Sequence, residues 1–140
     1  MPRGPHRLWL LIVFMVLLAL LAAACGGGTA DPENVFIAEE DDSGQTVTMA
    51  VGDALQIVLP ENPTTGYVWS VVTNDEAVLA SSAEPAYEVD SDAIGAGGVK
   101  TFMFRAAAPG TSVLRLVNAR AQETAVEPSR VFELTVQVVE

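Results

Sequence analysis

The sequence predicts an all-β protein, an antiparallel β-sandwich built from residues 45–140. Polar and apolar residues alternate in short runs from Gln45 to the C-terminus, a pattern typical of strands with one buried face. Clusters of glycine, proline and asparagine separate these runs, and no segment keeps a helical period. Short strands at such regular spacing favour a single sandwich domain with one core.

The strands follow one another with a turn signal after most of them. The alternating runs are 46–51, 55–59, 67–72, 100–106, 114–116 and 132–138. The turn signals fall at Gly52-Asp53, residues 62–66, Asn74-Asp75, residues 95–98 and Pro109-Gly110. We expect the indole of Trp69 in the core and Tyr67 at its edge, where the tyrosine would position the preceding loop.

The N-terminus has the three parts of an export signal. Basic residues lie among the first seven positions, and residues 8–24 are almost wholly apolar and end in small side chains. This apolar run is at the short limit for a membrane span. The stretch Ala22-Ala23-Ala24-Cys25 resembles the lipobox of bacterial lipoproteins, whose cysteine receives a lipid and becomes the new N-terminus. We therefore expect a signal peptide at 1–24 and a lipid on Cys25.

This signal implies a lipid-anchored, extracytoplasmic protein of the cell envelope, with an uncleaved anchor or a secreted form as alternatives. Residues 25–44 are expected to be a flexible tether, because glycines at 26–28 and an acidic run at 39–44 favour an open chain. A short apolar stretch at 35–37 could add an edge strand. The acidic run lacks the ligand spacing of a calcium loop.

Composition excludes several functions. Cys25 is the only cysteine, and the only histidine, His6, lies in the predicted signal. The mature chain therefore has no nucleophile–base pair of the usual kind and no ligand set for zinc, and we expect no enzyme, no metal and no cofactor. All 18 acidic residues follow Cys25 and the net charge is −11, which excludes nucleic acid as a partner.

The loop between the second and third runs is the strongest candidate for a binding site. It consists of Asn62, Pro63, Thr64, Thr65, Gly66 and Tyr67. Proline fixes its own φ and favours an extended Asn62, Gly66 can adopt a positive φ, and the threonines are stiff. A rigid, uncharged loop loses little entropy on binding, although an ordinary structured turn fits the same composition.

A second candidate is the glycine-rich loop that contains Gly95, Gly97 and Gly98. Glycine lets a backbone approach a partner closely. The same composition also fits a mobile loop without a binding role.

Together the two loops resemble the motifs of the chagasin family of cysteine-protease inhibitors. Residues 62–69 read NPTTGYVW and look like the family's NPTTGY-x-W motif, and residues 95–102 are similar to its G-x-G-G-x-x-x-F. The likeness extends over roughly 46–139. It implies an immunoglobulin-like β-sandwich whose three loops at one end plug the cleft of papain-like proteases, reversibly and without a covalent bond. Residues 64–66 would then lie nearest the protease's catalytic cysteine, with 95–98 on one flank.

The third loop departs from the family pattern, which usually has Arg-Pro-Trp or Arg-Pro-Phe. Arg120 matches the arginine, whereas Ala121 and Gln122 replace the proline and the aromatic residue. An interface aromatic can contribute about 2 kcal/mol or more. The sequence leaves two interpretations of Arg120 open: a contact with the protease, or a surface charge near Glu123.

The expected function is that of a monomeric inhibitor of papain-like cysteine proteases, attached to the membrane only through its lipid. The alternative is an envelope-anchored, immunoglobulin-like binding module that has no inhibitory activity.

Overall fold

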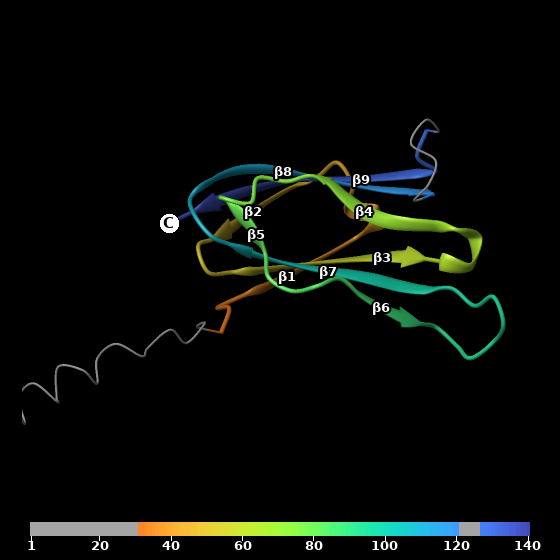
Figure 1. Ribbon diagram of the computed structural model, residues 1–140. Helices are drawn as coiled ribbons and strands as arrows, with labels where there is room; N and C mark the ends of the chain where they lie inside the picture. Colours follow the sequence, from red (N-terminus) through yellow and green to blue (C-terminus); the bar gives the residue numbers. More distant parts are fainter. Residues whose placement is uncertain (1–30, 121–126) are drawn as a thin grey trace, which may run out of the picture. The chain divides into compact units, whose positions relative to one another are not determined.

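Two β-sheets pack face to face in the computed structural model, which describes residues 31–120 and 127–140 (Figure 1). The predicted signal, Cys25, Ala121 and Gln122 lie outside these residues. The first sheet contains β1 (Val35–Glu39), β3 (Ala54–Glu61), β7 (Gly98–Ala106) and β5 (Leu79–Ser81), and β6 (Ala86–Val89) also pairs with β7. The second sheet contains β2 (Thr46–Ala50), β9 (Arg130–Val139), β8 (Gly110–Arg120) and β4 (Tyr67–Thr73).

The predicted sandwich is confirmed, and every alternating run lies in a strand, except that Val51, the last residue of the first run, is in the turn after β2. Most neighbouring strands are antiparallel, but the edge pairs β1–β3 and β2–β9 are parallel. The sequence did not predict β5 and β6. These strands have three and four residues and present too few apolar side chains to show a period. No helix among the described residues is long and apolar enough to cross a membrane.

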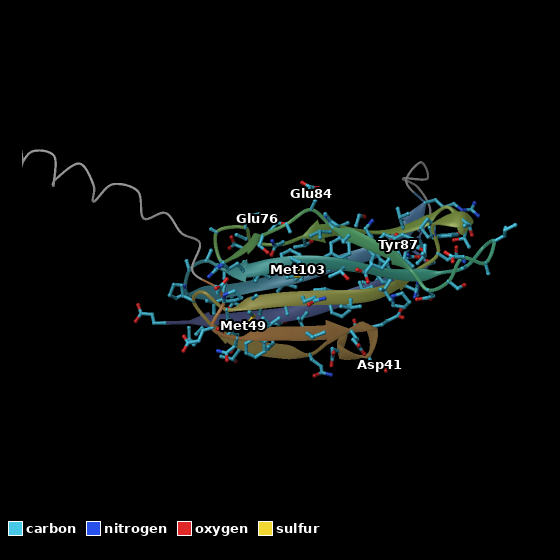
Figure 2. All side chains as sticks on the ribbon, turned by 90° about the horizontal axis from the view of Figure 1, so that it is seen from below. Asp41, Met49, Glu76, Glu84, Tyr87 and Met103 are labelled. Atoms are coloured by element: carbon cyan, nitrogen blue, oxygen red, sulfur yellow. The ribbon has the colours of Figure 1, made fainter. Side chains whose placement is uncertain are left out.

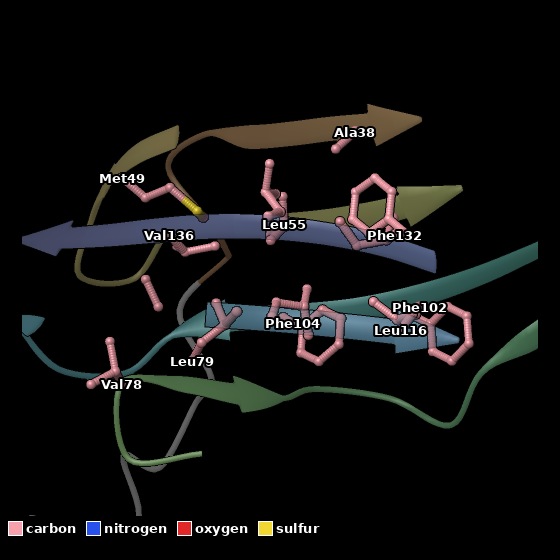
Figure 3. Packing of buried hydrophobic residues seen from close by; sticks show 14 of the residues in the cluster. Ala38, Met49, Leu55, Val78, Leu79, Phe102, Phe104, Leu116, Phe132 and Val136 are labelled. Carbon is pink, nitrogen blue, oxygen red and sulfur yellow. The ribbon is translucent and has the colours of Figure 1, made fainter. Parts of the chain in front are cut away.

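The core lies between the sheets and takes its side chains from the apolar phase of each run. Figure 3 shows Phe102 and Phe104 of β7 close to Leu116 of β8, within one continuous buried cluster. Trp69 is 1% exposed, which confirms its predicted place in the core. A fully buried side chain of this size contributes about 2 kcal/mol or more to folding, so the core fixes which face each strand turns inward.

The domain begins earlier than the sequence predicts, and the tether prediction for 25–44 is wrong for its second half. The compact unit starts at Asp31, and β1 pairs with β3 along its whole length. Ala38 is buried in the core, and the 3-10 turn η1 (Glu40–Asp42) follows directly. The acidic turn is stable because Asp42 Oδ2 accepts the Glu39 N–H at 2.9 Å. The charges of residues 39–42 alone favour a solvated linker, and the fold overrides them.

Acidic side chains lie along both edges of the sandwich. Glu76 and Glu84 lie on one edge, and Asp41 lies on the opposite edge (Figure 2). The Glu76 carboxylate accepts the Ser81 N–H at 3.1 Å. Within 31–120 and 127–140, no group of three or more histidine, cysteine or acidic residues could hold a metal ion.

Candidate functional site

The loop between β3 and β4 is a single 3-10 turn, η2 (Pro63–Thr65), capped by Asn62. The Asn62 Oδ1 atom accepts hydrogen bonds from the Thr64 N–H at 3.2 Å and the Thr64 hydroxyl at 2.6 Å. The Asn62 carbonyl accepts from the Thr65 N–H at 3.1 Å and the Thr65 hydroxyl at 2.7 Å. Both threonine hydroxyls therefore brace the loop from within, which makes the turn rigid as the sequence predicts.

Gly66 ends the turn in the left-handed region, with a φ of +82°. Its N–H donates to the Pro63 carbonyl at 2.9 Å, and the chain then enters β4 at Tyr67. Side chains rarely adopt this φ, so the position requires glycine. Residues 63–66 are all exposed and carry no charge, so the loop forms a neutral tip.

The glycine-rich loop lies beside this tip and is joined to it. The Asn62 Nδ2 atom donates to the Gly95 carbonyl at 3.1 Å. Gly98 is the first residue of β7 and lies against the backbone of the paired strand β6. An added Cβ would lie only 2.0 Å from the Glu88 carbonyl oxygen. The loop thus has a defined contact with the tip, and Gly98 is required by packing.

Gly97 of the glycine-rich loop faces the base of the η2 loop. A Cβ there would lie 3.4 Å from the Glu61 carbonyl oxygen and 3.8 Å from Cβ of Asn62. The Gly97 carbonyl accepts the Asp90 N–H at 2.9 Å, which closes the loop on itself. A Cβ at Gly97 would therefore be in ordinary van der Waals contact with the base of the η2 loop.

Arg120, at the end of β8, packs against the other side of the tip. It pairs with Tyr67 across the two strands, and its guanidinium lies 4.8 Å from the centre of the tyrosine ring. A Cβ on Gly66 would lie 3.9 Å from Arg120 Nε. The structure therefore brings Arg120 to the predicted site. Ala121 and Gln122, where the family pattern is broken, are outside the described residues.

A buried carboxylate supports the base of the loop, and sequence reasoning missed it. Glu61 is 4% exposed, and its Oε2 accepts the Trp69 N–H of β4 in the other sheet. Lys100 Nζ lies 3.8 Å from the same oxygen. The signal was present in the sequence, because Glu61 and Lys100 both occupy the core-facing phase of their runs, where opposite charges would have to pair.

Arg130 supports the same base from β9 and was also missed. Its Nη2 donates to the Pro60 carbonyl at 2.8 Å, and its guanidinium lies 5.1 Å from the centre of the Trp69 ring. Trp69 Nε1 donates to that same carbonyl at 2.9 Å. Arg130 shares the core-facing phase of Phe132 and Leu134, and this phase was the one signal in the sequence that its side chain turns inward.

Three segments lie at one end of the sandwich (Figure 1, right). They are the loop around η2, the loop between β6 and β7, and the ends of β8 and β9 that face each other there. This arrangement defines a class of protein, a β-sandwich that presents a rigid neutral loop between two flanking segments. Such a surface suits insertion into a groove of a protein partner.

Comparison with known proteins gives the family. The family model described as chagasin family peptidase inhibitor I42 matches residues 48–136. Chagasin of Trypanosoma cruzi is 33% identical over 82 residues, which cover 56% of this chain and 74% of chagasin. The chain belongs to the chagasin family of peptidase inhibitors, and it is therefore not an enzyme.

Solved structures show the same fold. The cysteine protease inhibitor EhICP2 of Entamoeba histolytica superposes with a TM-score of 0.69 at 21% identity, covering 76% of this chain and 96% of that protein. Amebosin superposes with a TM-score of 0.62 at 29% identity, covering 77% and 99%.

Proposed function

We propose that this chain inhibits papain-like cysteine proteases by inserting the tip of the η2 loop into the active-site cleft. The observation that carries the proposal is the tip itself, four exposed and uncharged residues on a turn that Asn62 braces with four hydrogen bonds. The family supports it, since chagasin is a relative and EhICP2 is named a cysteine protease inhibitor.

The neutral tip explains how the loop could enter a narrow cleft. A charge would have to lose its water there, at a cost of several kcal/mol unless it met a partner, whereas residues 63–66 carry none. The internal hydrogen bonds also mean that little loop entropy is lost on binding. Binding by a preformed loop needs no covalent step and is reversible.

The same hydrogen bonds explain why the loop would resist cleavage. A protease cuts a peptide bond that lies extended across its catalytic groups, but residues 63–65 form a 3-10 turn that ends in a left-handed Gly66. Extending this turn would break both bonds to the Asn62 carbonyl. Gly95, Gly97, Gly98 and Arg120 would contact the protease on either side of the cleft.

The proposal includes the predicted anchor. A lipid on Cys25 would hold a monomeric inhibitor at the cell envelope, where it would meet extracytoplasmic proteases. The support is the sequence of residues 1–25. Mass spectrometry of the N-terminal peptide from membranes would detect the lipid, and Cys25→Ser would release the protein into the soluble fraction. An unprocessed N-terminus would contradict this part.

An inhibition assay tests the proposed function. The chain from Gly26 onward should inhibit papain at submicromolar concentration, and Thr65→Arg should abolish inhibition because it adds a long charged side chain at the tip. Thr111→Arg is the matched control, since Thr111 is an exposed threonine at the start of β8, outside the site. No inhibition at micromolar concentration by folded protein would overturn the proposal.

One observation favours the alternative of a binding module without inhibitory activity. Gln122 stands where the family usually has an aromatic residue, and aromatic residues often dominate interface energy. Retention of the chain on a column of envelope proteins, together with no inhibition of papain, would support this alternative.

A further inference from the structure

We propose that Arg130 is a positioning residue for the inhibitory loop and that it connects this loop to the N-terminal segment of the domain. The residues that carry this role are Glu40, Pro60, Trp69 and Arg130 itself. The inference rests on the proposed function only where inhibition is the readout, because the positioning of the loop can also be measured without a protease.

The guanidinium of Arg130 makes contacts in three directions. Its Nη1 atom donates to Glu40 Oε1 at 3.1 Å and Oε2 at 3.2 Å, and its Nη2 atom donates to the Pro60 carbonyl at 2.8 Å. Its central carbon, Cζ, lies over the Trp69 ring, 5.1 Å from the ring centre. These partners come from η1, β3 and β4, so one side chain of β9 joins three other segments.

Two of these contacts lie at the base of the η2 loop. Pro60 is two residues before Asn62, and Trp69 is three residues after Gly66, so they lie on the strands that enter and leave the loop. The Pro60 carbonyl accepts from both the Trp69 indole and Arg130. A shift of the guanidinium would therefore change how the two strands approach each other just below Asn62.

The chemistry of arginine fits this place better than that of lysine. A guanidinium donates from several fixed directions and stacks on an aromatic ring at the same time, whereas an ammonium is a point charge. The Arg130 and Glu40 side chains are each 38% exposed, and an ion pair at that exposure contributes little stability. We therefore assign Glu40 the role of orienting the guanidinium, and the bond to Pro60 and the stacking on Trp69 the role of bracing the loop.

This arrangement changes the role of the N-terminal segment. Residues 35–42 read as a tether in sequence, yet β1 and η1 carry Glu40 to the guanidinium. The family model begins only at residue 48 and does not include this segment. In this chain, the segment next to the predicted anchor takes part in shaping the binding loop.

The test uses the chain from Gly26 onward with Arg130→Met, Arg130→Lys and Glu40→Gln. Matched controls are Arg115→Met and Glu133→Gln, an oppositely charged pair that faces solvent across β8 and β9. Two readouts are compared with thermal unfolding: the inhibition constant against papain, and hydrogen exchange at the Thr65 and Gly66 amides. Fluorescence of Trp69, the only tryptophan after Cys25, reports the stacking directly.

We expect Arg130→Met to raise the inhibition constant about tenfold, the effect of losing one hydrogen bond to a charged group. Exchange at Thr65 and Gly66 should accelerate while core amides such as Leu116 stay protected. Arg130→Lys should recover part of both effects, Glu40→Gln should cause a smaller loss, and the two controls should behave as the unchanged chain.

Two results would overturn the inference. One is Arg130→Met with unchanged exchange at Thr65 and Gly66. The other is acceleration of all amides together, which would show a general loss of stability and no specific positioning. If the unchanged chain does not inhibit papain, the proposed function fails, and the exchange experiment still decides whether Arg130 positions the loop.

Discussion

Asn62 and Gly95, which are 33 residues apart in the chain, are joined by a hydrogen bond of 3.1 Å from the asparagine amide to the glycine carbonyl. The Oδ1 atom of the same side chain accepts hydrogen bonds from the Thr64 N–H and the Thr64 hydroxyl. One side chain thus caps the central turn and fixes the position of the flanking loop, so Asn62 determines the shape of the proposed binding surface.

Substitution of Asn62 separates these two roles. Asn62→Asp keeps the Oδ1 acceptor and the cap but removes the amide donor to Gly95. Asn62→Ala removes both the cap and the bond to Gly95 and leaves only the backbone carbonyl that accepts from Thr65. Loss of a cap costs about 1 kcal/mol. We expect inhibition of papain to weaken about fivefold for Asn62→Asp and more than tenfold for Asn62→Ala.

Thr111→Arg again serves as the control for expression and folding. Equal inhibition by Asn62→Asp and the unchanged chain would show that the bond to Gly95 has no part in binding.

Gly98 offers a test of the packing below the flanking loop. An added Cβ would meet the Glu88 carbonyl at 2.0 Å, so Gly98→Ala must push β6 away from β7. We expect a loss of about 2 kcal/mol or more in the free energy of unfolding, measured by urea titration. Gly44→Ala is the comparison, because Gly44 has a φ of +88° but nothing within 4 Å of the added atom, and it should cost about 1 kcal/mol. An equal cost for the two variants would contradict the packing argument.

Glu61 and Lys100 should show coupled effects on stability. Glu61 is buried and holds the Trp69 amide, so Glu61→Gln should lower the free energy of unfolding by about 1–3 kcal/mol. Lys100→Met should cost less, since Lys100 is more exposed and lies 3.8 Å away. A double-mutant cycle measures the interaction between the two residues. Strictly additive effects would show that the pair does not interact.

Asp53 makes the stability of the far end of the domain depend on pH. Its Oδ2 accepts the Ala50 N–H at 2.9 Å, and its Oδ1 accepts from the backbone and side chain of Asn34. The bond from Ala50 lowers the pKa of the Asp53 carboxyl most, the bonds from Asn34 lower it further, and desolvation opposes them.

Because the pKa of Asp53 is lower in the folded state, its stabilisation is complete above the unfolded pKa of about 3.9 and is lost as the pH falls through the folded value. Urea titrations between pH 7 and pH 2 should therefore show a stability gap between the unchanged chain and Asp53→Asn that is constant above pH 5 and closes below pH 4. A gap that does not change with pH would contradict this role of the charge.

Much of the fold followed from the apolar period of the sequence. Met49, Phe102, Leu114 and Val136 all lie in the core on the phase that alternation predicts. The strand β1 was harder, since only Phe36 and Ala38 turn inward and an acidic turn follows. Pairing with β3, which the local sequence cannot show, decides its structure.

The site was predictable where a single segment determines it. The Pro63 and Gly66 backbone and the stiff threonines follow from local chemistry, and the structure places them as expected. The partners of Arg130 were not predictable, because Glu40 and Pro60 are 90 and 70 residues away and meet it only in the folded chain. The bond from Asn62 to Gly95 was hidden for the same reason.

Competition for the cleft tests the central claim most directly. The dissociation constant of the chain from Gly26 onward is measured with papain whose cleft is open and with papain whose catalytic cysteine carries a covalent peptidyl inhibitor that fills the cleft. If the η2 loop occupies the cleft, the filled enzyme should bind at least about a hundredfold more weakly, a difference of about 2.7 kcal/mol. Equal affinity for the open and the filled enzyme would contradict the account.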